Sequence, residues 1–435
     1  MAKFIIIGGS PVSGVIQPAG SKNALLPILA ATLLADTPST LLEVPSISDA
    51  KTMLKLMEGL GAGIAYENYG SIVTVTPTLT NADINKDQYQ KIRGSNLLLS
   101  PILQKLGKVR GYYPGGDKIG LRSMAAHIDG FVQSGYIVTE HKDEGYFDVE
   151  RNEAFTGEEY CVFLFEPSAT ATENVILINV LGKGIVTIEN AACEPQIIDL
   201  CTLLQKMGAD ISGVGTNRLV IKKVEKLNGA THMIVKDHVY IASFIVFALV
   251  TGGDLYIQHV VWEYLQPLFP VLKYFNVSWE VQGTTLHIPP HQTLRLNEGY
   301  NIYENVGIYS QPWPLLPTDV LPLIVMLATQ AEGEFLFFEK MYADRLKNIT
   351  KLEHLGAELT LLDDHRVKVR GKTPLKASDL TCPDLRSGIV YLAAMLAASG
   401  TSTLYNVEHI ERAYPKIEEV LTSLGAQIQK YEDTL

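Results

Sequence analysis

A lysine stands at the start of an apolar helical segment near the beginning of the chain. The run Ser21-Lys22-Asn23 follows a turn at residues 18–20, and the strongly helical sequence 24–34 comes directly after it. Ser21 suits the N-cap position of such a helix. Because the first turn of a helix has unpaired N–H groups and the positive end of the dipole, a lysine there favours an anion site. Taken alone, the pattern is more typical of a surface lysine.

A glycine-rich segment supplies a carboxylate and an arginine. Residues 113–122 read Tyr-Pro-Gly-Gly-Asp-Lys-Ile-Gly-Leu-Arg, so that Asp117 lies among three glycines and Arg122 follows two residues after the last of them. Glycines let a loop move and let its backbone approach a ligand closely. A plain surface turn would have the same composition, so this segment by itself does not decide the function.

Acidic and basic residues recur in the second half of the chain where one element ends and the next begins. Asp319 precedes an apolar run, 320–327, where an N-cap would explain it equally well. Guanidinium groups bind carboxylates and phosphates through two parallel hydrogen bonds, so recurring arginines favour convergence on one anionic ligand. Structural ion pairs would explain each group singly. The groups are Asp344-Arg345, Asp384-Leu385-Arg386 and His409-Ile410-Glu411-Arg412.

A short closing element recurs at intervals of roughly 70 to 80 residues and indicates six related structural units. In each copy a helical pattern ends at Gly, or at Asn in one copy, and a strand pattern follows. Glycine is expected there because a helix commonly ends with a residue in the left-handed conformation. The copies are Leu60-Gly61-Ala62, Ser134-Gly135-Tyr136, Met207-Gly208-Ala209, Phe275-Asn276-Val277, Leu355-Gly356-Ala357 and Leu424-Gly425-Ala426.

The length of 435 residues exceeds what one core usually supports, so we expect two domains of three units each. No linker composition marks the boundary, and the repeat count gives residues 21–235 for one domain and 1–20 with 236–435 for the other. The first 20 residues are expected to form a β-hairpin, because Gly8-Gly9 is followed by prolines and not by the helix of a dinucleotide-binding turn. The fold class is α/β (α+β).

The composition excludes several classes of protein. A formal net charge of −11 argues against a nucleic-acid partner or an anionic membrane, both of which need a basic surface. The four cysteines lack metal-knuckle spacing and secreted-scaffold density, which favours a reducing cytoplasm. We see no secretory signal. The apolar runs 240–250 and 389–398 are shorter than the roughly 20 residues of a membrane span and predict buried helices.

At these residues the chain resembles the enolpyruvyl transferases and, among them, the UDP-N-acetylglucosamine 1-carboxyvinyltransferases, over its whole length. The resemblance implies a two-domain inside-out α/β barrel with three βαβαββ-type repeats per domain, an active site in the cleft between them, and a lid loop at about 112–123. The motifs that carry it are Gly20-Ser21-Lys22-Asn23-Ala24, Ile92-Arg93-Gly94-Ser95, Pro114-Gly115-Gly116-Asp117 with Ile119, Gly120 and Arg122, Pro167-Ser168-Ala169-Thr170-Ala171-Thr172-Glu173-Asn174, Glu189-Asn190-Ala191-Ala192-Cys193-Glu194-Pro195, Pro317-Thr318-Asp319, Asp344-Arg345, Pro383-Asp384-Leu385-Arg386 and His409-Ile410-Glu411-Arg412.

The resemblance also implies a reaction. The enolpyruvyl group of phosphoenolpyruvate would be transferred to the 3-hydroxyl of UDP-N-acetylglucosamine with release of phosphate, the first committed step of peptidoglycan synthesis. The acceptor hydroxyl would add to C2 while a proton is delivered to C3, and phosphate would then leave, so the site needs a positioned acid and a positioned base. We expect no metal and no organic cofactor, no nucleic-acid or membrane partner, and a cytoplasmic monomer.

The resemblance assigns roles residue by residue. The catalytic residues would be Asp117 as general acid, Asp319 as base, Lys22 and Arg412. Phosphoenolpyruvate would be held by Lys22, Arg93, Arg122, Arg345, Asp384, Leu385 and Arg412. The acceptor would contact Asn23, Arg122, Ser168, Thr170 and Asp319.

Departures from the family pattern lie mostly on the acceptor side. Asp117 stands where many members have cysteine, so it can donate a proton only if burial stabilises its protonated form, and we expect resistance to fosfomycin, which alkylates that cysteine. Ser123 replaces a usual proline, Thr170 a frequent glycine, and Tyr240 a usual acid. The identity of the acceptor is therefore less firmly indicated than the reaction type.

Three alternatives stay open. The 5-enolpyruvylshikimate-3-phosphate synthases usually have Ser-Lys-Ser at residues 21–23 and lack the Gly-Gly-Asp lid pattern of residues 115–117. An enolpyruvyl transferase acting on a different nucleotide would explain the acceptor-side departures. A non-catalytic paralogue that binds a nucleotide sugar would have no use for the five cations on the phosphoenolpyruvate side.

Overall fold

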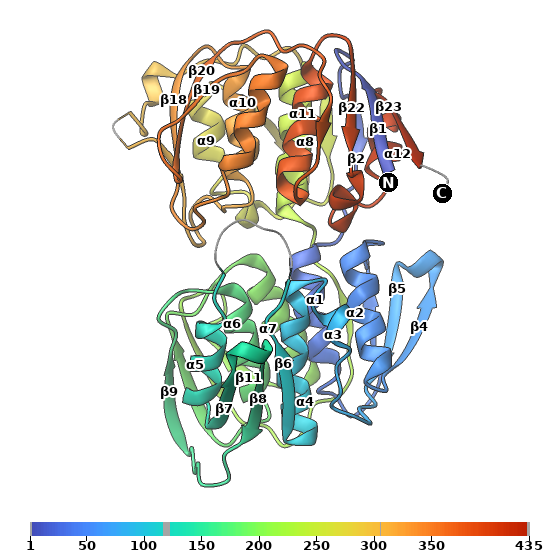
Figure 1. The fold of residues 1–435 in the computed structure, drawn as a ribbon, viewed down its shortest axis with the longest axis vertical. Coiled ribbons are helices and arrows are strands. Elements are labelled where there is room, and N and C mark those ends of the chain that lie inside the picture. The colour runs from blue at the N-terminus through green and yellow to red at the C-terminus, as the bar shows by residue number, and fades with distance from the viewer. Residues whose placement is uncertain (1, 116–121, 305, 433–435) are drawn as a thin grey trace. The chain divides into compact units, whose positions relative to one another are not determined.

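A computed structural model of the chain describes residues 2–115, 122–304 and 306–432 (Figure 1). The chain divides into two compact units. Unit 1 contains residues 2–19 and 236–432, and unit 2 contains residues 20–115 and 122–235.

The elements of unit 2 alternate between helices and strands, as the repeated pattern in the sequence predicts. They are α1 (Lys22–Thr32), β3 (Ser39–Leu42), α2 (Ser48–Gly59), β4 (Gly63–Glu67), η1 (Asn68–Gly70), β5 (Ile72–Thr76), α3 (Lys86–Tyr89), η2 (Arg93–Leu98), α4 (Leu99–Leu106), β6 (Lys108–Tyr112), α5 (Ala125–Gln133), β7 (Tyr136–His141), η3 (Lys142–Glu144), β8 (Tyr146–Arg151), β9 (Glu159–Phe163), α6 (Ala169–Asn179), β10 (Ile185–Glu189), α7 (Pro195–Met207), β11 (Asp210–Ser212), β12 (Arg218–Lys222) and β13 (Thr231–Met233).

Unit 1 begins with two strands from the start of the chain and continues after residue 236. Its elements are β1 (Ala2–Ile7), β2 (Gly14–Ile16), α8 (His238–Thr251), β14 (Leu255–Ile257), η4 (Trp262–Tyr264), α9 (Phe269–Tyr274), β15 (Glu280–Gln282), β16 (Thr285–Ile288), η5 (Glu298–Tyr300), β17 (Ile308–Ser310), α10 (Leu321–Thr329), β18 (Gly333–Glu339), η6 (Lys347–Leu355), β19 (Glu358–Leu361), β20 (Arg366–Gly371), β21 (Leu380–Thr381), α11 (Leu385–Ala397), β22 (Thr401–Tyr405), η7 (Val407–Arg412), α12 (Ile417–Ser423) and β23 (Gln427–Glu432).

The sheets follow a βαβαββ order. In unit 2, β9 runs parallel to β10 across α6, and β11 and β12 complete the sheet β11-β12-β10-β9 after α7. The same parallel first pair occurs in β13 with β3, and in unit 1 in β2 with β14, β17 with β18 and β21 with β22. The described strands form six separate sheets, three in each unit, and none closes on itself into a continuous barrel.

The predicted hairpin at the start of the chain is wrong. Strand β1 pairs antiparallel with β22 and β23, whereas β2 pairs parallel with β14 in a different sheet. The two strands complete two different repeats of unit 1, so residues 8–13 connect two sheets. Local alternation predicted the strands, but their partners lie more than 200 residues away in sequence.

The six predicted closing elements share one backbone conformation. Gly61, Gly135, Gly208, Gly356 and Gly425 have φ between 83° and 109°, and Asn276 has φ of 59°. Each follows a helical segment and precedes a strand, except that no strand is assigned directly after Asn276. The left-handed conformation explains glycine at five copies, and asparagine tolerates it best among the other residues.

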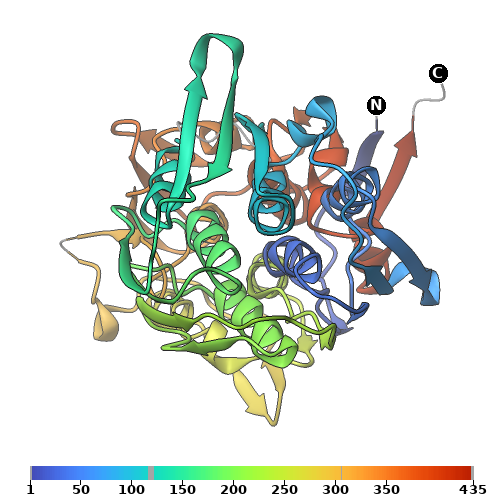
Figure 2. The same ribbon diagram turned by 90° about the horizontal axis from the view of Figure 1, so that it is seen from below.

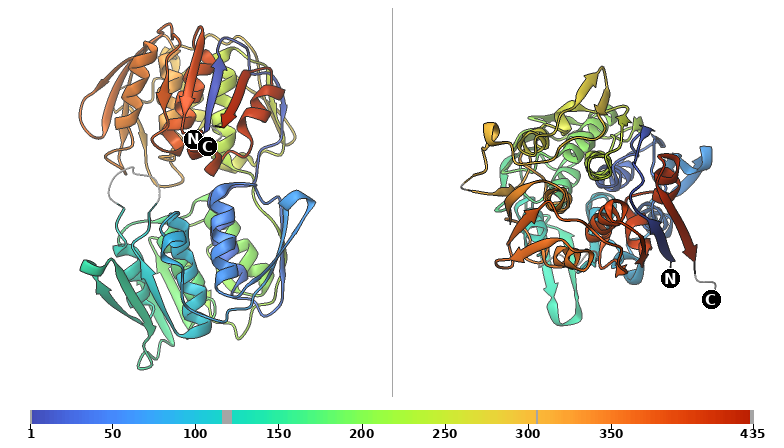
Figure 3. Two further views of the ribbon diagram at one scale, coloured as in Figure 1. Left: turned by 45° about the vertical axis from the view of Figure 1, so that its right-hand side comes forward. Right: turned by 90° about the horizontal axis from the view of Figure 1, so that it is seen from above.

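The helices of each unit lie inside and the sheets cover them. In unit 1, α8, α10 and α11 contact one another, and every residue from His238 to Leu249 is buried. A helix that is apolar on all sides must be enclosed in this way. Figure 2 shows the helices of unit 2 with its strands outside them, and the views in Figure 3 show the same layering for unit 1. The predicted buried helices at 240–250 and 389–398 are α8 and α11. Among the described residues, no helix combines the length and apolarity that a membrane span needs.

Candidate active site

A carboxylate lies between two arginines in unit 1. One oxygen of Asp319 contacts the guanidinium of Arg345, and the other lies 2.6 Å from Nη2 of Arg386. Both arginine side chains are only 5% exposed. The N-cap of α10 is Val320, without a side-chain hydrogen bond, so Asp319 does not cap that helix. Its side chain belongs to the ion-pair cluster, so the N-cap interpretation of Asp319 is wrong.

Asp384 positions Arg386. It is the N-cap of α11, and its Oδ1 accepts hydrogen bonds of 2.9 Å from the backbone N–H groups of Arg386 and Ser387. Its Oδ2 accepts from the Ser387 hydroxyl at 2.6 Å and from the Asn348 amide at 3.2 Å. Leu385, the first residue of α11, is buried. Asp384 therefore fixes the start of the helix that carries Arg386, and these four contacts stabilise the fold.

Glu339 positions the loop that carries Arg345. It is fully buried at the end of β18, and its Oε1 accepts from the backbone N–H groups of Met341 at 2.8 Å and Tyr342 at 3.2 Å. Its Oε2 accepts from the Thr318 hydroxyl at 2.7 Å. The same hydroxyl accepts from Nε of Arg345 at 3.3 Å. A buried carboxylate with three donors is satisfied, and it links the segment before Asp319 to the arginine that binds it.

Two further side chains complete the cluster in unit 1. The Tyr414 hydroxyl accepts from Arg386 at 3.3 Å and lies 2.6 Å from the Ser243 hydroxyl. His238 begins α8, and burial lowers its pKa, although Asp237 and Asp319 act in the opposite direction. A neutral imidazole at this point adds no further positive charge. Arg412 ends η7, two residues before Tyr414, and is partly buried.

Lys22 begins α1 in unit 2, as predicted. Ser21 is the N-cap, and its hydroxyl accepts from the backbone N–H of Ala24 at 3.3 Å. Nζ of Lys22 lies 3.6 Å from Oδ2 of Asp49, in the first turn of α2, and the two side chains are 12% and 4% exposed. Asn23, the second residue of α1, is partly buried. The predicted cation is therefore held at a helix N-terminus by a buried carboxylate.

Arg93 holds the backbone where the glycine-rich segment returns to unit 2. Its Nη1 donates to the carbonyl of Arg122 at 3.1 Å, and its Nη2 donates to the carbonyl of Ser123 at 3.0 Å. A Cβ at Gly94 would lie 2.6 Å from Cδ1 of Leu26, so glycine allows η2 to approach α1 one turn from Lys22. Arg93 therefore begins an element that packs against the helix of Lys22, and it fixes the backbone at Arg122. Asp117 lies outside the described residues.

The acceptor-side candidates lie at the start of α6. Ser168 is the N-cap, and its hydroxyl accepts from the backbone N–H of Ala171 at 3.4 Å. Oγ1 of Thr170 lies 3.1 Å from Nε2 of His127, which is buried in α5. Both predicted residues therefore lie on one helical turn of unit 2.

Two buried carboxyl groups lie close to this turn. Burial raises the pKa of Glu194 to about 7 and that of Glu173 well above its usual value, and Glu194 raises the latter further. Oε2 of Glu194 is buried without a hydrogen-bond partner in the described part of the chain. The fold therefore favours the protonated forms of both groups, whereas the carboxylate of Asp319 is paired with two arginines.

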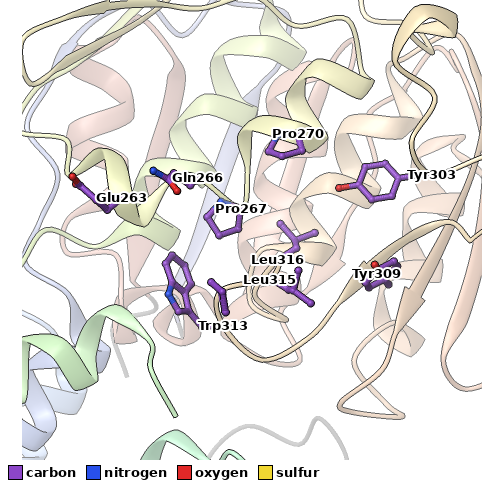
Figure 4. A pocket seen from close by; sticks show the side chains of 10 residues that line it. Glu263, Gln266, Pro267, Pro270, Tyr303, Tyr309, Trp313, Leu315 and Leu316 are labelled. Carbon is purple, nitrogen blue, oxygen red and sulfur yellow. The ribbon is translucent and has the colours of Figure 1, made fainter. Parts of the chain in front are cut away.

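A pocket of about 470 Å³ lies in unit 1, and Asp319, Arg345 and Arg386 do not line it. Trp313 forms part of its wall (Figure 4). The ring of Trp313 packs edge-on against His238, with centroids 5.7 Å apart. The ten residues that line it include neither lysine nor arginine. The pocket therefore does not suit phosphate, and the cationic clusters remain the candidates for an anionic substrate.

The structure brings together some of the predicted residues and adds others. In unit 1, Asp319 contacts Arg345 and Arg386, and Asp384 caps the helix that carries Arg386. In unit 2, α1 with Lys22 and α6 with the Ser168–Thr170 turn both pack against η2, which begins at Arg93. Arg93 also binds the carbonyl of Arg122. Sequence reasoning did not assign roles to Arg386, Asp49, His127 or Glu339. Arg386 stood in a motif that was already recognised, whereas the other three carried no local signal. In the described residues, no three potential ligands among His, Cys, Asp and Glu are grouped to hold a metal ion.

Comparison with known proteins places the chain in a family. The model of the EPSP synthase (3-phosphoshikimate 1-carboxyvinyltransferase) family matches residues 6–421. UDP-N-acetylglucosamine 1-carboxyvinyltransferase from Bradyrhizobium diazoefficiens is 37% identical, with 98% of each chain covered. The enzyme of the same name from Treponema denticola is 38% identical, with 99% of this chain and 100% of that protein covered.

Solved structures agree on the fold. The enolpyruvyl transferase NikO from Streptomyces tendae matches with a TM-score of 0.86 at 23% identity, covering 99% of this chain and 98% of that one. EPSP synthase from Acinetobacter baumannii matches with a TM-score of 0.74 at 18% identity, covering 99% and 100%. With three sheets in each unit, five of the six containing the parallel first pair, and with full-length relatives, the chain belongs to the 1-carboxyvinyltransferase (enolpyruvyl transferase) family that includes EPSP synthase and UDP-N-acetylglucosamine 1-carboxyvinyltransferase.

Proposed function

We propose that this chain transfers the enolpyruvyl group of phosphoenolpyruvate to the 3-hydroxyl of UDP-N-acetylglucosamine and releases phosphate. The observation that supports it most is the carboxylate of Asp319 held between Arg345 and Arg386, in a chain related over its whole length to enzymes named for this reaction. The cluster has the groups that the reaction needs, a carboxylate for a hydroxyl proton and guanidinium groups for carboxylate or phosphate.

Asp319 acts as the base in this proposal. The acceptor oxygen forms a bond to C2 of phosphoenolpyruvate, the hydroxyl proton passes to Asp319, and an acid delivers a proton to C3. The tetrahedral intermediate then loses a proton from C3 and the C2–O bond to phosphate. The two arginines keep Asp319 charged before the reaction and offset negative charge that develops nearby.

The cations of unit 2 bind the same substrates. Lys22, Arg93 and Arg122 hold phosphoenolpyruvate together with Arg345, Asp384, Leu385 and Arg412, and Lys22 and Arg412 also act in catalysis. Asn23, Arg122, Ser168, Thr170 and Asp319 contact the acceptor. On this proposal the two clusters serve one reaction in a cleft between the domains, and a lid at about 112–123 closes over it.

Asp117 is the general acid in this proposal. A carboxyl group lacks the thiolate that opens the epoxide of fosfomycin, so wild-type activity should survive preincubation with that compound. Asp117→Cys should become sensitive in a time-dependent manner. Irreversible loss of wild-type activity at stoichiometric fosfomycin would contradict this role.

The biological setting follows from the reaction. We place the chain at the first committed step of peptidoglycan synthesis, and hence in cell-wall formation and cell division. It would act in the cytoplasm as a monomer, without a metal or an organic cofactor and without nucleic-acid or membrane partners.

Phosphate release tests the proposal directly. The purified chain is incubated with phosphoenolpyruvate and, in parallel, with UDP-N-acetylglucosamine, shikimate 3-phosphate or UMP. Of the three acceptors, we expect only UDP-N-acetylglucosamine to give phosphate release from phosphoenolpyruvate. Release only with UMP would indicate a different nucleotide acceptor, and release only with shikimate 3-phosphate would indicate an EPSP synthase. Tight binding of UDP-N-acetylglucosamine without release from any pair would indicate a non-catalytic paralogue.

A further inference from the structure

A chain of buried polar side chains runs through unit 2 to the first turn of α6. Nδ2 of Asn174 lies 2.9 Å from Nδ1 of His127, and Nε2 of His127 lies 3.1 Å from Oγ1 of Thr170. Asn174 is fully buried and His127 is 1% exposed, whereas Thr170 is partly exposed. The network therefore begins in the core and ends at a hydroxyl group that a ligand can reach.

The amide of Asn174 has a defined orientation. One end of it lies 3.2 Å from the backbone carbonyl of Asn96, and a carbonyl can only accept, so this end is the NH₂ group. The other end accepts from the Ser100 hydroxyl at 2.7 Å. The same NH₂ group faces His127, so it donates to Nδ1 of the imidazole. His127 is therefore an acceptor at Nδ1.

His127 is neutral at physiological pH. Burial lowers its pKa to about 3, and the nearby positive charge of Arg93 contributes in the same direction. A neutral imidazole carries one proton, and because Nδ1 accepts, the proton is on Nε2. Nε2 therefore donates to the Thr170 oxygen, and the core fixes the direction of this hydrogen bond.

The hydroxyl proton of Thr170 must then point elsewhere. In the parts of the chain that the structure describes, no protein oxygen accepts it. Thr170 is the second residue of the 11-residue helix α6, whose first N–H groups also lack partners within the helix. The N–H groups of Ala171 and Thr172 already donate to Ser168. The Thr170 hydroxyl is therefore the donor at this turn that suits an oxygen atom of a ligand.

We infer that Thr170 donates a hydrogen bond to an oxygen of the acceptor's nucleotide and that His127 is the positioning residue that fixes its direction. This inference rests on the proposed function, because it takes a uridine nucleotide as the ligand. The oxygen belongs either to the uracil ring or to the diphosphate. Glycine, which is frequent in the family at this position, has no hydroxyl, so Thr170 adds a contact specific to this chain.

Removing the hydroxyl tests the inference. Thr170→Val keeps the shape and should raise KM for UDP-N-acetylglucosamine roughly five- to tenfold, with kcat and KM for phosphoenolpyruvate unchanged. Thr170→Ser should restore wild-type KM. Thr202→Val is the matched control, because Thr202 on α7 donates to the Ile198 carbonyl at 2.8 Å within its own helix. Equal KM values for Thr170→Val and wild type would overturn the inference.

A double-mutant cycle tests the positioning role. His127→Phe should raise KM for the acceptor about as much as Thr170→Val does, and combining the two should add little. His127→Gln, which can place an NH₂ group near Thr170, should recover part of the loss. Fully additive effects, or equal losses in KM for both substrates, would overturn the positioning role. If His127→Phe does not fold, the Thr170 variants still decide the donor role.

Inhibitors distinguish the two oxygen sources. Weaker inhibition of Thr170→Val by both uridine and UDP would assign the contact to uracil, and weaker inhibition by UDP alone would assign it to the diphosphate. Unchanged inhibition by both would contradict the inference. If the wild type releases no phosphate, the proposed function fails, and calorimetric binding of UDP-N-acetylglucosamine to wild type and Thr170→Val still tests this contact separately.

Discussion

The two units hold their functional groups in different ways. In unit 1, Asp319 is paired with two buried arginines, and Arg345 and Arg386 each have a second partner in Thr318 and Tyr414. In unit 2, Arg93 donates to backbone carbonyls, and Thr170 is oriented by a neutral imidazole. Ion pairs hold the side chains around Asp319 in unit 1, whereas hydrogen bonds to backbone carbonyls and to a neutral side chain hold Arg93 and Thr170 in unit 2.

This difference predicts which substitutions damage the fold and which affect binding alone. Removing one member of a buried ion pair leaves the other without compensation, which typically costs about 3 to 5 kcal/mol. Backbone carbonyls and hydroxyl groups near the surface can turn to water instead. We therefore expect coupled losses of activity and stability around Asp319 in unit 1 and mainly kinetic effects at Arg93 and Thr170 in unit 2.

The largest effect is expected at Asp319. Asp319→Asn removes the base and the counter-charge of two arginines, so kcat should fall by about 10³-fold and the free energy of unfolding by about 3 kcal/mol. Phosphate release and denaturant unfolding measure the two losses. Asp344→Asn is the control, because that carboxylate is half exposed and lies 4.0 Å from Lys347. Retention of wild-type kcat in Asp319→Asn would remove the base assignment.

A smaller effect is expected at Arg93. Lysine can reach only one of the two carbonyls, so Arg93→Lys should loosen the backbone at Arg122 and raise KM for phosphoenolpyruvate about tenfold. The free energy of unfolding should fall by less than about 1 kcal/mol. Arg110→Lys provides the comparison, since Arg110 makes a similar two-point contact with the exposed Asp148. A loss of stability as large as that at Asp319 would show that the units do not differ in this way.

The third effect concerns the pH dependence of stability. Because the folded pKa of Glu194 is about 7, folding favours its neutral form, and this contribution is complete below the unfolded value near 4.5 and lost as pH rises through 7. The amount is about 3 kcal/mol. Glu194→Gln should flatten this part of the stability–pH profile, and the exposed Glu153→Gln should not. An unchanged slope in Glu194→Gln would show that Glu194 is ionised in the folded protein.

Local signals in the sequence predicted much of the fold. Helix ends at glycine, the Ser21 cap and the buried apolar helices depend on neighbouring residues, and the structure confirms them. The partners of β1 and β2 depend on contacts across more than 200 residues, and alternation alone could not identify them. His127 is similar: its role depends on Asn174, 47 residues away, and on burial that no local pattern reveals.

The family motifs indicated which residues matter at the site, but not how they are bonded. Asp319 was expected to be a base or an N-cap, and its position between Arg345 and Arg386 depends on the packing of α10 against α11. The sequence placed Arg386 next to Asp384 without a role of its own. Which side chains pair across two elements depends on how those elements pack. The repeats in the sequence predict only where the helices begin.

The central claim is that the cations of one unit and the carboxylate of the other serve one reaction. Single-turnover phosphate release with phosphoenolpyruvate and UDP-N-acetylglucosamine tests it most directly, in the wild type, Lys22→Met, Asp319→Asn and the double variant, each checked for folding. We predict that either single substitution abolishes most of the phosphate burst and that the double variant is barely worse than Asp319→Asn, because groups that act together are not additive. A burst of wild-type rate and size in folded Lys22→Met would contradict the account.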